Sequence, residues 1–290
     1  MTAQRIEDLD LFLLPIDTPE FAADPTPWLE KARAKHPWLA MSAIGPVLTS
    51  YRAIDEIMRM DDALKMPGGE IVSIMGAEGT GWGDFAQEMM LVREGPDHQR
   101  LRGSVSGAFG PNNVKRMRPV MIETISALLD EWAPKEAFDF AEFAANFPVR
   151  VMFALIGGDV SKLPAIISSL EVQGTSFNMI VEDMPQIEEA YQVLWRFVDD
   201  LIEERGPDAG KGDLLDDLIA ANTRGELSDK ELRQMLVFLF GAGYDTSKNL
   251  LTLLMNTMID HPDMWQCCAQ DKDFCAIPAL RIPTASRPAT

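Results

Sequence analysis

Most of the chain shows the spacing of amphipathic helices, with apolar residues recurring every three or four positions. This spacing predicts two short helices, over residues 26–36 and 51–60. Longer helices are predicted over residues 114–132, 141–156, 187–205 and 228–260. The pattern therefore predicts a mainly α protein.

Two segments depart from helical spacing. Residues 38–51 place short apolar runs on both sides of Gly45 and Pro46, which is typical of a β-hairpin. Residues 66–85 are rich in glycine and methionine, and we expect them to form a mobile loop. Their glycines do not have the spacing of phosphate-binding motifs, which argues against a nucleotide site in this loop.

The last predicted helix combines a strong start signal with a conflict at its centre. Ser228 is followed three residues later by Glu231, which is the capping-box pattern. The helix is apolar on nearly all sides, so we expect it to be buried. Residues 241–246 (GAGYDT) nevertheless contain two glycines, an acid and a threonine. A helix that served only the core would avoid these residues, because each glycine costs about 1 kcal/mol and a buried acid needs a partner.

Such a conflict is typical of a functional site. Gly243 has no side chain, so a flat ligand can lie against the backbone there. Thr246 can donate a hydrogen bond to the carbonyl of Ala242, bend the helix and open a polar notch. Asp245 can then relay protons into the notch. On periodicity alone, a glycine-kinked helix with Asp245 facing solvent explains the pattern equally well.

Charge and cysteine content narrow the classes of function. The 290 residues include 45 acids and 26 bases, for a net charge of −19. This balance argues against a general nucleic-acid binder and against docking on an anionic membrane. The three cysteines, Cys267, Cys268 and Cys275, form neither a disulfide framework nor a zinc motif. Together with the lack of a signal or membrane-spanning segment, they predict a cytoplasmic location.

Five motifs, in order, resemble those of the cytochrome P450 family of soluble bacterial type. Residues 242–246 (AGYDT) resemble the acid–alcohol pair of the family's central helix. Residues 94–102 (EGPDHQRLR) resemble the signature of an earlier helix that contacts haem. Further matches are residues 147–157 (FPVRVMFALIG), 213–219 (DLLDDLI) and 260–263 (DHPD). The order and spacing agree across roughly residues 25–280.

The resemblance implies a P450-like helical fold with a small N-terminal β-hairpin. It also implies a haem-dependent monooxygenase that inserts one oxygen atom of O2 into a small apolar organic substrate. His98 and Arg102 would hold a haem propionate, which suits two residues on one helix face. Ala242 and Gly243 would face the haem and leave room for oxygen.

The same resemblance assigns proton delivery during oxygen activation to Asp245 and Thr246. It also implies a ferredoxin-type redox partner. The family docks an acidic ferredoxin near the segment that corresponds to residues 93–118. Here this segment has a net charge of +4, from Arg93, Arg100, Arg102, Lys115, Arg116 and Arg118 against Glu94 and Asp97. Such a patch would steer an acidic partner, although chance clustering also explains it.

The resemblance ends near residue 280. The family's haem-ligating cysteine lies in a glycine-rich loop preceded by an ExxR motif, and neither pattern is found here. We therefore expect a partial P450-like domain over residues 1–280, with an aberrant tail rich in Pro, Ala and Thr over 281–290. The chain would be truncated or frameshifted before ExxR and inactive alone, with part of the central helix's apolar face uncovered. The alternatives are a non-catalytic helical fragment and a binder of apolar small molecules.

Overall fold

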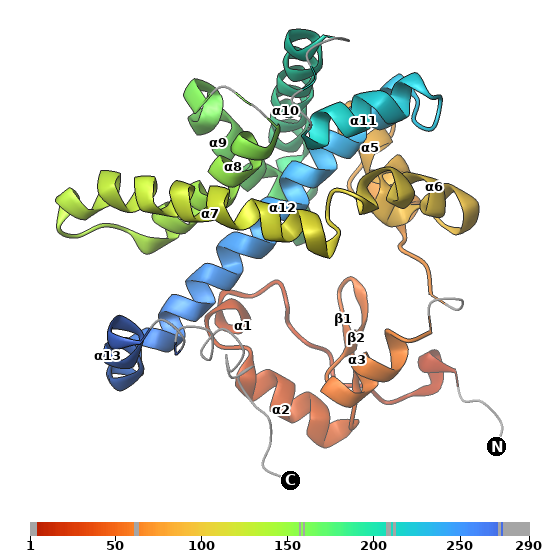
Figure 1. Ribbon diagram of the computed structural model, residues 1–290. Helices are drawn as coiled ribbons and strands as arrows, with labels where there is room; N and C mark the ends of the chain where they lie inside the picture. Colours follow the sequence, from red (N-terminus) through yellow and green to blue (C-terminus); the bar gives the residue numbers. More distant parts are fainter. Residues whose placement is uncertain are drawn as a thin grey trace. The chain divides into compact units, whose positions relative to one another are not determined.

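The computed structural model describes residues 5–60, 64–156, 158, 160–206, 210, 213–271 and 274. It is mainly helical, as predicted (Figure 1). The chain divides into two compact units, residues 1–66 and 67–290. Each unit has a hydrophobic core of its own.

The first unit contains the predicted β-hairpin. Its elements are α1 (Pro19–Ala23), α2 (Thr26–Lys35), β1 (Leu39–Ser42), β2 (Gly45–Leu48) and α3 (Tyr51–Ile57). The strands are antiparallel, with Leu39 opposite Leu48. The turn lies at residues 43–44, so the prediction that Gly45 and Pro46 form the turn is wrong. Both residues belong to β2, where proline is tolerated because an edge strand leaves some N–H positions unpaired.

The second unit is built from ten helices within its described residues. They are α4 (Gly68–Ile74), α5 (Gly81–Glu88), α6 (Gly95–Ser106), α7 (Pro111–Trp132), α8 (Phe140–Ile156), α9 (Leu163–Gly174), α10 (Met184–Arg205), α11 (Leu214–Thr223), α12 (Asp229–Ile259) and α13 (Pro262–Gln270). The four predicted long helices correspond to α7, α8, α10 and α12. Helices α9 and α11 were not predicted from the spacing.

The prediction of a mobile loop over residues 66–85 is wrong, because α4 and most of α5 lie in it. Thr80 caps α5 by accepting a hydrogen bond from the backbone N–H of Gly83 at 2.9 Å. Glu188 on α10 also accepts bonds from the N–H groups of Gly81 (3.2 Å) and Trp82 (2.8 Å). A contact from a distant helix thus anchors this glycine-rich segment.

Helix α12 is the long blue helix of Figure 1 and packs against α8, α9 and α10. An aromatic cluster joins three of these helices. Phe153 on α8 stacks on Phe197 of α10, with ring centroids 5.2 Å apart. Phe240 on α12 meets both rings edge-on, at 5.9 and 5.4 Å. Because edge-to-face pairs are favourable and all three rings are buried, the cluster holds the first half of α12 in the core.

The second half of α12 is different. Leu250, Leu253 and Ile259 are 54%, 60% and 70% exposed. The expectation of burial along the whole helix is therefore wrong, whereas the expectation of an open apolar face is met over this half. None of the described helices is long and apolar enough to cross a membrane.

A buried arginine ties together the ends of three helices. Arg205 closes α10, and its side chain is only 3% exposed. Its guanidinium donates to Asp213 at 2.6 Å and to Asp216, at the start of α11. It also donates to the carbonyl of Ile156, the last residue of α8, at 2.6 Å. The two carboxylates thus neutralise a cation that would otherwise be buried at high cost.

We predict that Arg205→Met destabilises the protein by about 3 kcal/mol, because it leaves two partly buried carboxylates without their cation. Equilibrium urea unfolding followed by tryptophan fluorescence measures this change. Arg224→Met is the matched control, since Arg224 forms an exposed pair with Glu226 and its loss should leave the unfolding midpoint unchanged. Equal midpoints for the two variants would contradict the role assigned to Arg205.

Candidate functional site

The start of α12 has the predicted capping box. The Ser228 hydroxyl accepts a hydrogen bond from the N–H of Glu231 at 3.2 Å. The Glu231 carboxylate accepts one from the N–H of Ser228 at 2.8 Å. Glu231 also binds Arg100 of α6, with Nη2 and Oε1 2.6 Å apart. The Glu231 carboxylate therefore both caps the N-terminus of α12 and binds α6 to it.

The predicted hydrogen bond of Thr246 is present at the centre of α12. The Thr246 hydroxyl donates to the carbonyl of Ala242 at 2.7 Å, as the sequence predicts. Both residues are exposed, so this turn of the helix offers polar groups on an open surface. At Gly243, an added Cβ would lie 3.7 Å from the Met152 sulfur of α8. The Cβ position of Gly243 therefore faces α8, while Ala242 and Thr246 lie on the open side of the helix. That Ala242 and Gly243 face a haem stays a prediction.

Asp245 lies close to the end of α9, because a Cβ added to Gly174 would be 3.0 Å from its Oδ2 atom. It is half-buried rather than fully facing solvent. Burial raises the pKa of its carboxyl above the ordinary value. Lys248 opposes this rise and Glu171 of α9 adds to it. Asp245 is thus a carboxyl whose charge depends on its neighbours, which is a common property of groups that transfer protons.

A polar cluster joins α12 to α9 beside this acid. The buried hydroxyl of Tyr244 donates to Glu171 Oε1 at 3.0 Å. The Lys248 ammonium donates to the same oxygen at 2.8 Å. Lys248 holds the pKa of Glu171 below its usual range, while burial and the nearby Glu171 raise that of Tyr244. Glu171 is therefore an anion that accepts two hydrogen bonds from α12.

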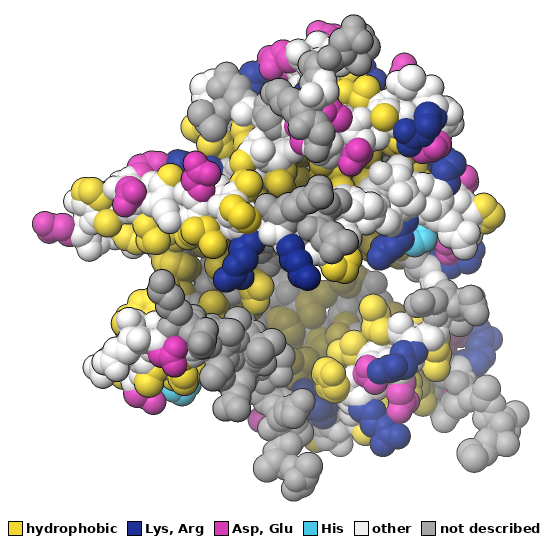
Figure 2. Space-filling view, viewed as in Figure 1, with side chains coloured by type: hydrophobic (Ala, Val, Ile, Leu, Met, Phe, Trp, Pro, Cys, Tyr) yellow, Lys and Arg dark blue, Asp and Glu magenta, His cyan; other side chains and the backbone are white. Residues whose placement is uncertain are grey.

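On α6, the structure places His98 and Arg102 one turn apart, with His98 half-buried and Arg102 exposed. Among the described residues, neither side chain has a hydrogen-bond or ion-pair partner. Figure 2 shows basic side chains and a histidine gathered on the surface over α6. The pair therefore offers a cationic group with unused donors.

The structure thus brings Ala242, Asp245 and Thr246 together on one turn, and His98 and Arg102 on another helix. Within the described part of the chain, no hydrogen bond or ion pair joins the two groups directly. The two helices are joined by the pair of Arg100 and Glu231, which lies about 16 Å along the α12 axis from Ala242.

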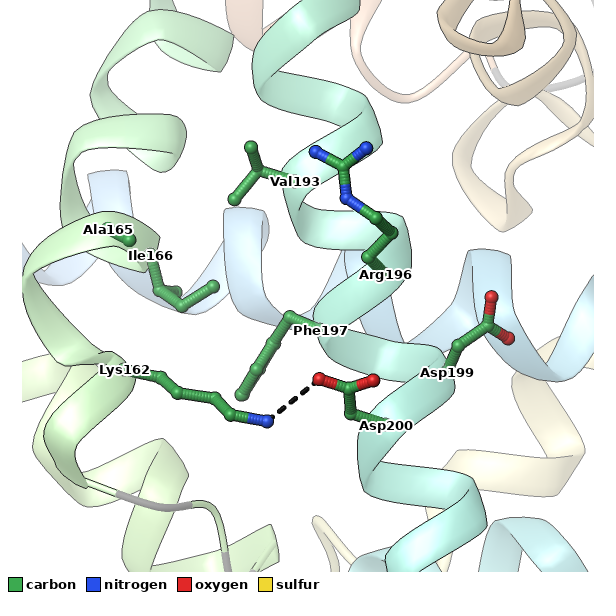
Figure 3. Close-up of a pocket in the computed structure, with 8 residues that line it drawn as sticks. All are labelled: Lys162, Ala165, Ile166, Val193, Arg196, Phe197, Asp199 and Asp200. Carbon is green, nitrogen blue, oxygen red and sulfur yellow. Dashed lines mark hydrogen bonds and ion pairs between the residues drawn. The ribbon is translucent and has the colours of Figure 1, made fainter.

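A pocket of about 510 Å³ lies between α9 and α10, away from both groups (Figure 3). Figure 3 shows the ion pair between Lys162 and Asp200 among the lining residues, with Nζ and Oδ2 2.8 Å apart. The remaining lining residues are Ala165, Ile166, Val193, Arg196, Phe197 and Asp199. None of them was predicted to be a site residue from the sequence.

Comparison with known proteins identifies the family. The model of the cytochrome P450 family matches residues 76–274. The chain belongs to the cytochrome P450 family.

Individual P450 proteins are similar over most of this chain. Luteothin monooxygenase of Streptomyces thioluteus is 29% identical over 260 residues, which cover 88% of this chain and 63% of that protein. The biotin biosynthesis cytochrome P450 of Bacillus subtilis is 25% identical over 254 residues, covering 84% and 62%. The chain thus spans less than two thirds of the length of these two relatives.

Solved P450 structures show the same fold. CalO2 superimposes with a TM-score of 0.79 at 21% identity, covering 93% of this chain and 68% of that chain. P450BioI, in complex with an acyl carrier protein ligated to hexadec-9Z-enoic acid, gives a TM-score of 0.75 at 21% identity. It covers 90% of this chain and 68% of that chain. The predicted P450-like helical fold is therefore confirmed.

P450 proteins use haem. The described residues suit its propionate and its flat face, but they do not include the family's cysteine loop. Arg102 has a guanidinium with free donors that suit a propionate, and His98 lies one turn before it. Ala242 and Thr246 leave an open surface where the flat face of a macrocycle can lie. The described cysteines, Cys267 and Cys268, lie in α13 and not in a glycine-rich loop. Cys275 and the expected tail over residues 281–290 lie outside the described residues.

The sequence did not point to Glu171, Gly174 or Lys248. Lys248 follows Tyr244 by four positions and Asp245 by three, which places all three on neighbouring faces of one helix. That spacing is a usable signal for Lys248. No such signal exists for Glu171, because α9 itself was not predicted and its partner Tyr244 is 73 residues away.

The Glu231 contacts predict a defined pH dependence of stability. The hydrogen bond from Arg100, followed by those from Ser228, lowers the pKa of Glu231 to about 2. A lowered pKa stabilises the fold above the unfolded value of 4.5, and this stabilisation is lost as pH falls toward 2. Since Glu231 is partly exposed, the gain is modest. We expect the free energy of unfolding of the wild type to exceed that of Glu231→Gln by about 1 kcal/mol at pH 7.

Urea unfolding of both proteins at pH 7, 5, 4 and 3 measures this dependence. The difference in free energy of unfolding between wild type and Glu231→Gln should shrink below pH 4.5. Glutamine preserves the capping box, so the difference reports mainly the Arg100 contact. Glu123→Gln, on an exposed part of α7, controls for the change in net charge. A difference that stays constant with pH would contradict this account.

Proposed function

We propose that this P450 chain serves a haem-dependent monooxygenase reaction on a small apolar organic substrate. The observation that carries the proposal is the turn of α12 in which Thr246 bonds to Ala242 beside the half-buried Asp245. The similarity to luteothin monooxygenase supports the same class of reaction.

Bound haem would activate O2, so that with two electrons and two protons one oxygen atom enters the substrate and the other leaves as water. Arg102 and His98 would hold a propionate of that haem, with the Arg102 guanidinium donating to its carboxylate. Thr246 keeps its proton on Oγ1, directed at the Ala242 carbonyl, and can redirect it into the notch. Asp245, whose pKa is raised by burial, can take up and return a proton next to this hydroxyl.

Apolar side chains favour an apolar substrate. The segment after α9 begins with η5 (Thr175–Asn178), where Phe177 is 75% exposed. Ile180 and Val181 follow it and are 44% and 48% exposed. Exposed apolar groups of this density commonly mark a binding surface. P450BioI, which shares the fold, was solved with a protein-linked fatty acid.

The test is haem binding by the full chain. Haem should bind with a stoichiometry of one if this chain serves the family's reaction. After reduction under carbon monoxide, an unshifted Soret band is expected, because the sequence lacks the family's cysteine loop and the chain should be inactive alone. A long-wavelength band would show a thiolate ligand and overturn the expected inactivity. No haem uptake would contradict the proposal and favour a non-catalytic helical protein or an apolar-ligand binder.

The same titration tests the propionate site. Arg102→Gln should weaken haem binding roughly tenfold, because it removes a charge-assisted hydrogen bond. Arg196→Gln is the matched control, since Arg196 is an exposed arginine on α10. Equal affinities for the two variants would exclude Arg102 from the propionate site.

We further propose that a ferredoxin-type partner docks on residues 93–118. Two of the six basic residues there are engaged within the chain: Arg93 donates to the carbonyl of Glu88 and Arg100 binds Glu231. Arg102, Lys115 and Arg118 are exposed. The family membership supports use of a redox partner, and a cytoplasmic location, also proposed here, would bring the two proteins together.

Docking predicts a salt-dependent association rate. The double variant Lys115→Glu/Arg118→Glu should slow association with an acidic ferredoxin at least tenfold at low salt, with a smaller effect at high salt. Stopped-flow or surface plasmon resonance measures the rate. Arg196→Glu/Lys31→Glu carries the same charge change elsewhere and controls for net charge. Equal slowing by both double variants would place the docking site elsewhere.

A further inference from the structure

The centre of α12 presents different residues to α9 and to the open side of the helix. Successive residues of a helix are rotated by about 100°, so Tyr244 and Lys248 share one side and Ala242 and Thr246 share another. Asp245 lies between these two sides. The contacts agree with this geometry, because Tyr244 and Lys248 both bind α9 while Ala242 and Thr246 are exposed.

The last residue of α9 lies directly against the acid. A Cβ added to Gly174 would be 3.0 Å from Asp245 Oδ2, which is closer than an ordinary contact allows. Glycine is thus the residue that lets the backbone of α9 approach the carboxylate. Any larger residue would require Asp245 or the end of α9 to move.

One turn earlier on α9, Glu171 fastens the two helices together. Its Oε1 atom accepts from both the Tyr244 hydroxyl (3.0 Å) and the Lys248 ammonium (2.8 Å). The Tyr244 side chain is 1% exposed, so its hydroxyl needs this partner. Glu171 and Gly174 are three residues apart and therefore lie on the same face of α9.

We propose that Glu171, Gly174 and Lys248 are positioning residues, which hold the Asp245 carboxylate at the end of α9 and make its charge depend on the position of that helix. The proposal rests on the proposed function, in which Asp245 handles protons for oxygen activation. Its consequence concerns the substrate. The exposed Phe177 lies only three residues beyond Gly174, so an apolar substrate that packs against it acts on the same end of α9.

The charges near Asp245 make the proposal measurable. Among the described residues, the charged groups that act on it are Lys248 on its own helix and Glu171 on α9. The cation lowers the pKa of Asp245 and the anion raises it. Removing the two charges should therefore move this pKa in opposite directions.

The experiment is an NMR titration of the full chain carrying aspartate labelled at the side-chain carboxyl carbon. Comparison with Asp245→Asn identifies the Asp245 signal. Glu171→Gln should lower its pKa, and Lys248→Met should raise it. Lys248→Arg keeps the charge and should restore a value near wild type. Glu189→Gln, on an exposed part of α10, is the control for loss of one negative charge.

Gly174→Ala tests the contact itself. It should change the chemical shift and pKa of Asp245, whereas Gly69→Ala, at a site with nothing within 4 Å, should change neither. Circular dichroism confirms that each variant remains folded. The proposal is overturned if Glu171→Gln and Lys248→Met titrate like the Glu189→Gln control, or if Gly174→Ala leaves the Asp245 signal unchanged.

These measurements need no added haem. They separate this proposal from the monooxygenase proposal, which fails if the chain takes up no haem. A positive titration without haem uptake would keep the coupling of α9 to Asp245 and reject its use in oxygen chemistry.

Discussion

Burial of the first half of α12 is the constraint on which the rest of the second unit depends. The aromatic cluster of Phe153, Phe197 and Phe240 holds this half between α8 and α10. The polar residues that follow must then find partners, because a buried polar group without one is costly. The buried hydroxyl of Tyr244 donates to Glu171, whereas the exposed Thr246 donates to the carbonyl of Ala242 one turn earlier. The site and the core are therefore two results of one helix being buried up to its centre.

Helix α9, which binds Tyr244 and Lys248 of α12, is itself held in place by α10. The two helices pack together, and the Gln173 side-chain amide donates to the carbonyl of Ile187 at 2.7 Å. Gln173 immediately precedes Gly174, the residue that touches Asp245. A continuous series of contacts thus leads from the aromatic core through α10 and α9 to the acid.

Features with local causes could be predicted from the sequence. The capping box at Ser228 and the bond from Thr246 to Ala242 depend on residues three or four positions apart, and both are present. The prediction of a mobile loop over residues 66–85 was wrong because the order of this segment has a distant cause. Its order depends on Glu188, which binds the start of α5 from more than 100 residues away. Glycine content alone indicates freedom of the backbone and cannot reveal a distant carboxylate that removes it.

The same distinction applies within the site. Asp245 and Thr246 were found because they interrupt an apolar helix, while Glu171 lies on a helix whose pattern was not recognised. Lys248 belongs to both groups, since its spacing from Tyr244 is local and its partner Glu171 is distant. It also lies where α12 changes from buried to open, just before the exposed Leu250. The ion pair with Glu171 therefore joins the turn that carries Asp245 to α9 at the point where the buried half of α12 ends.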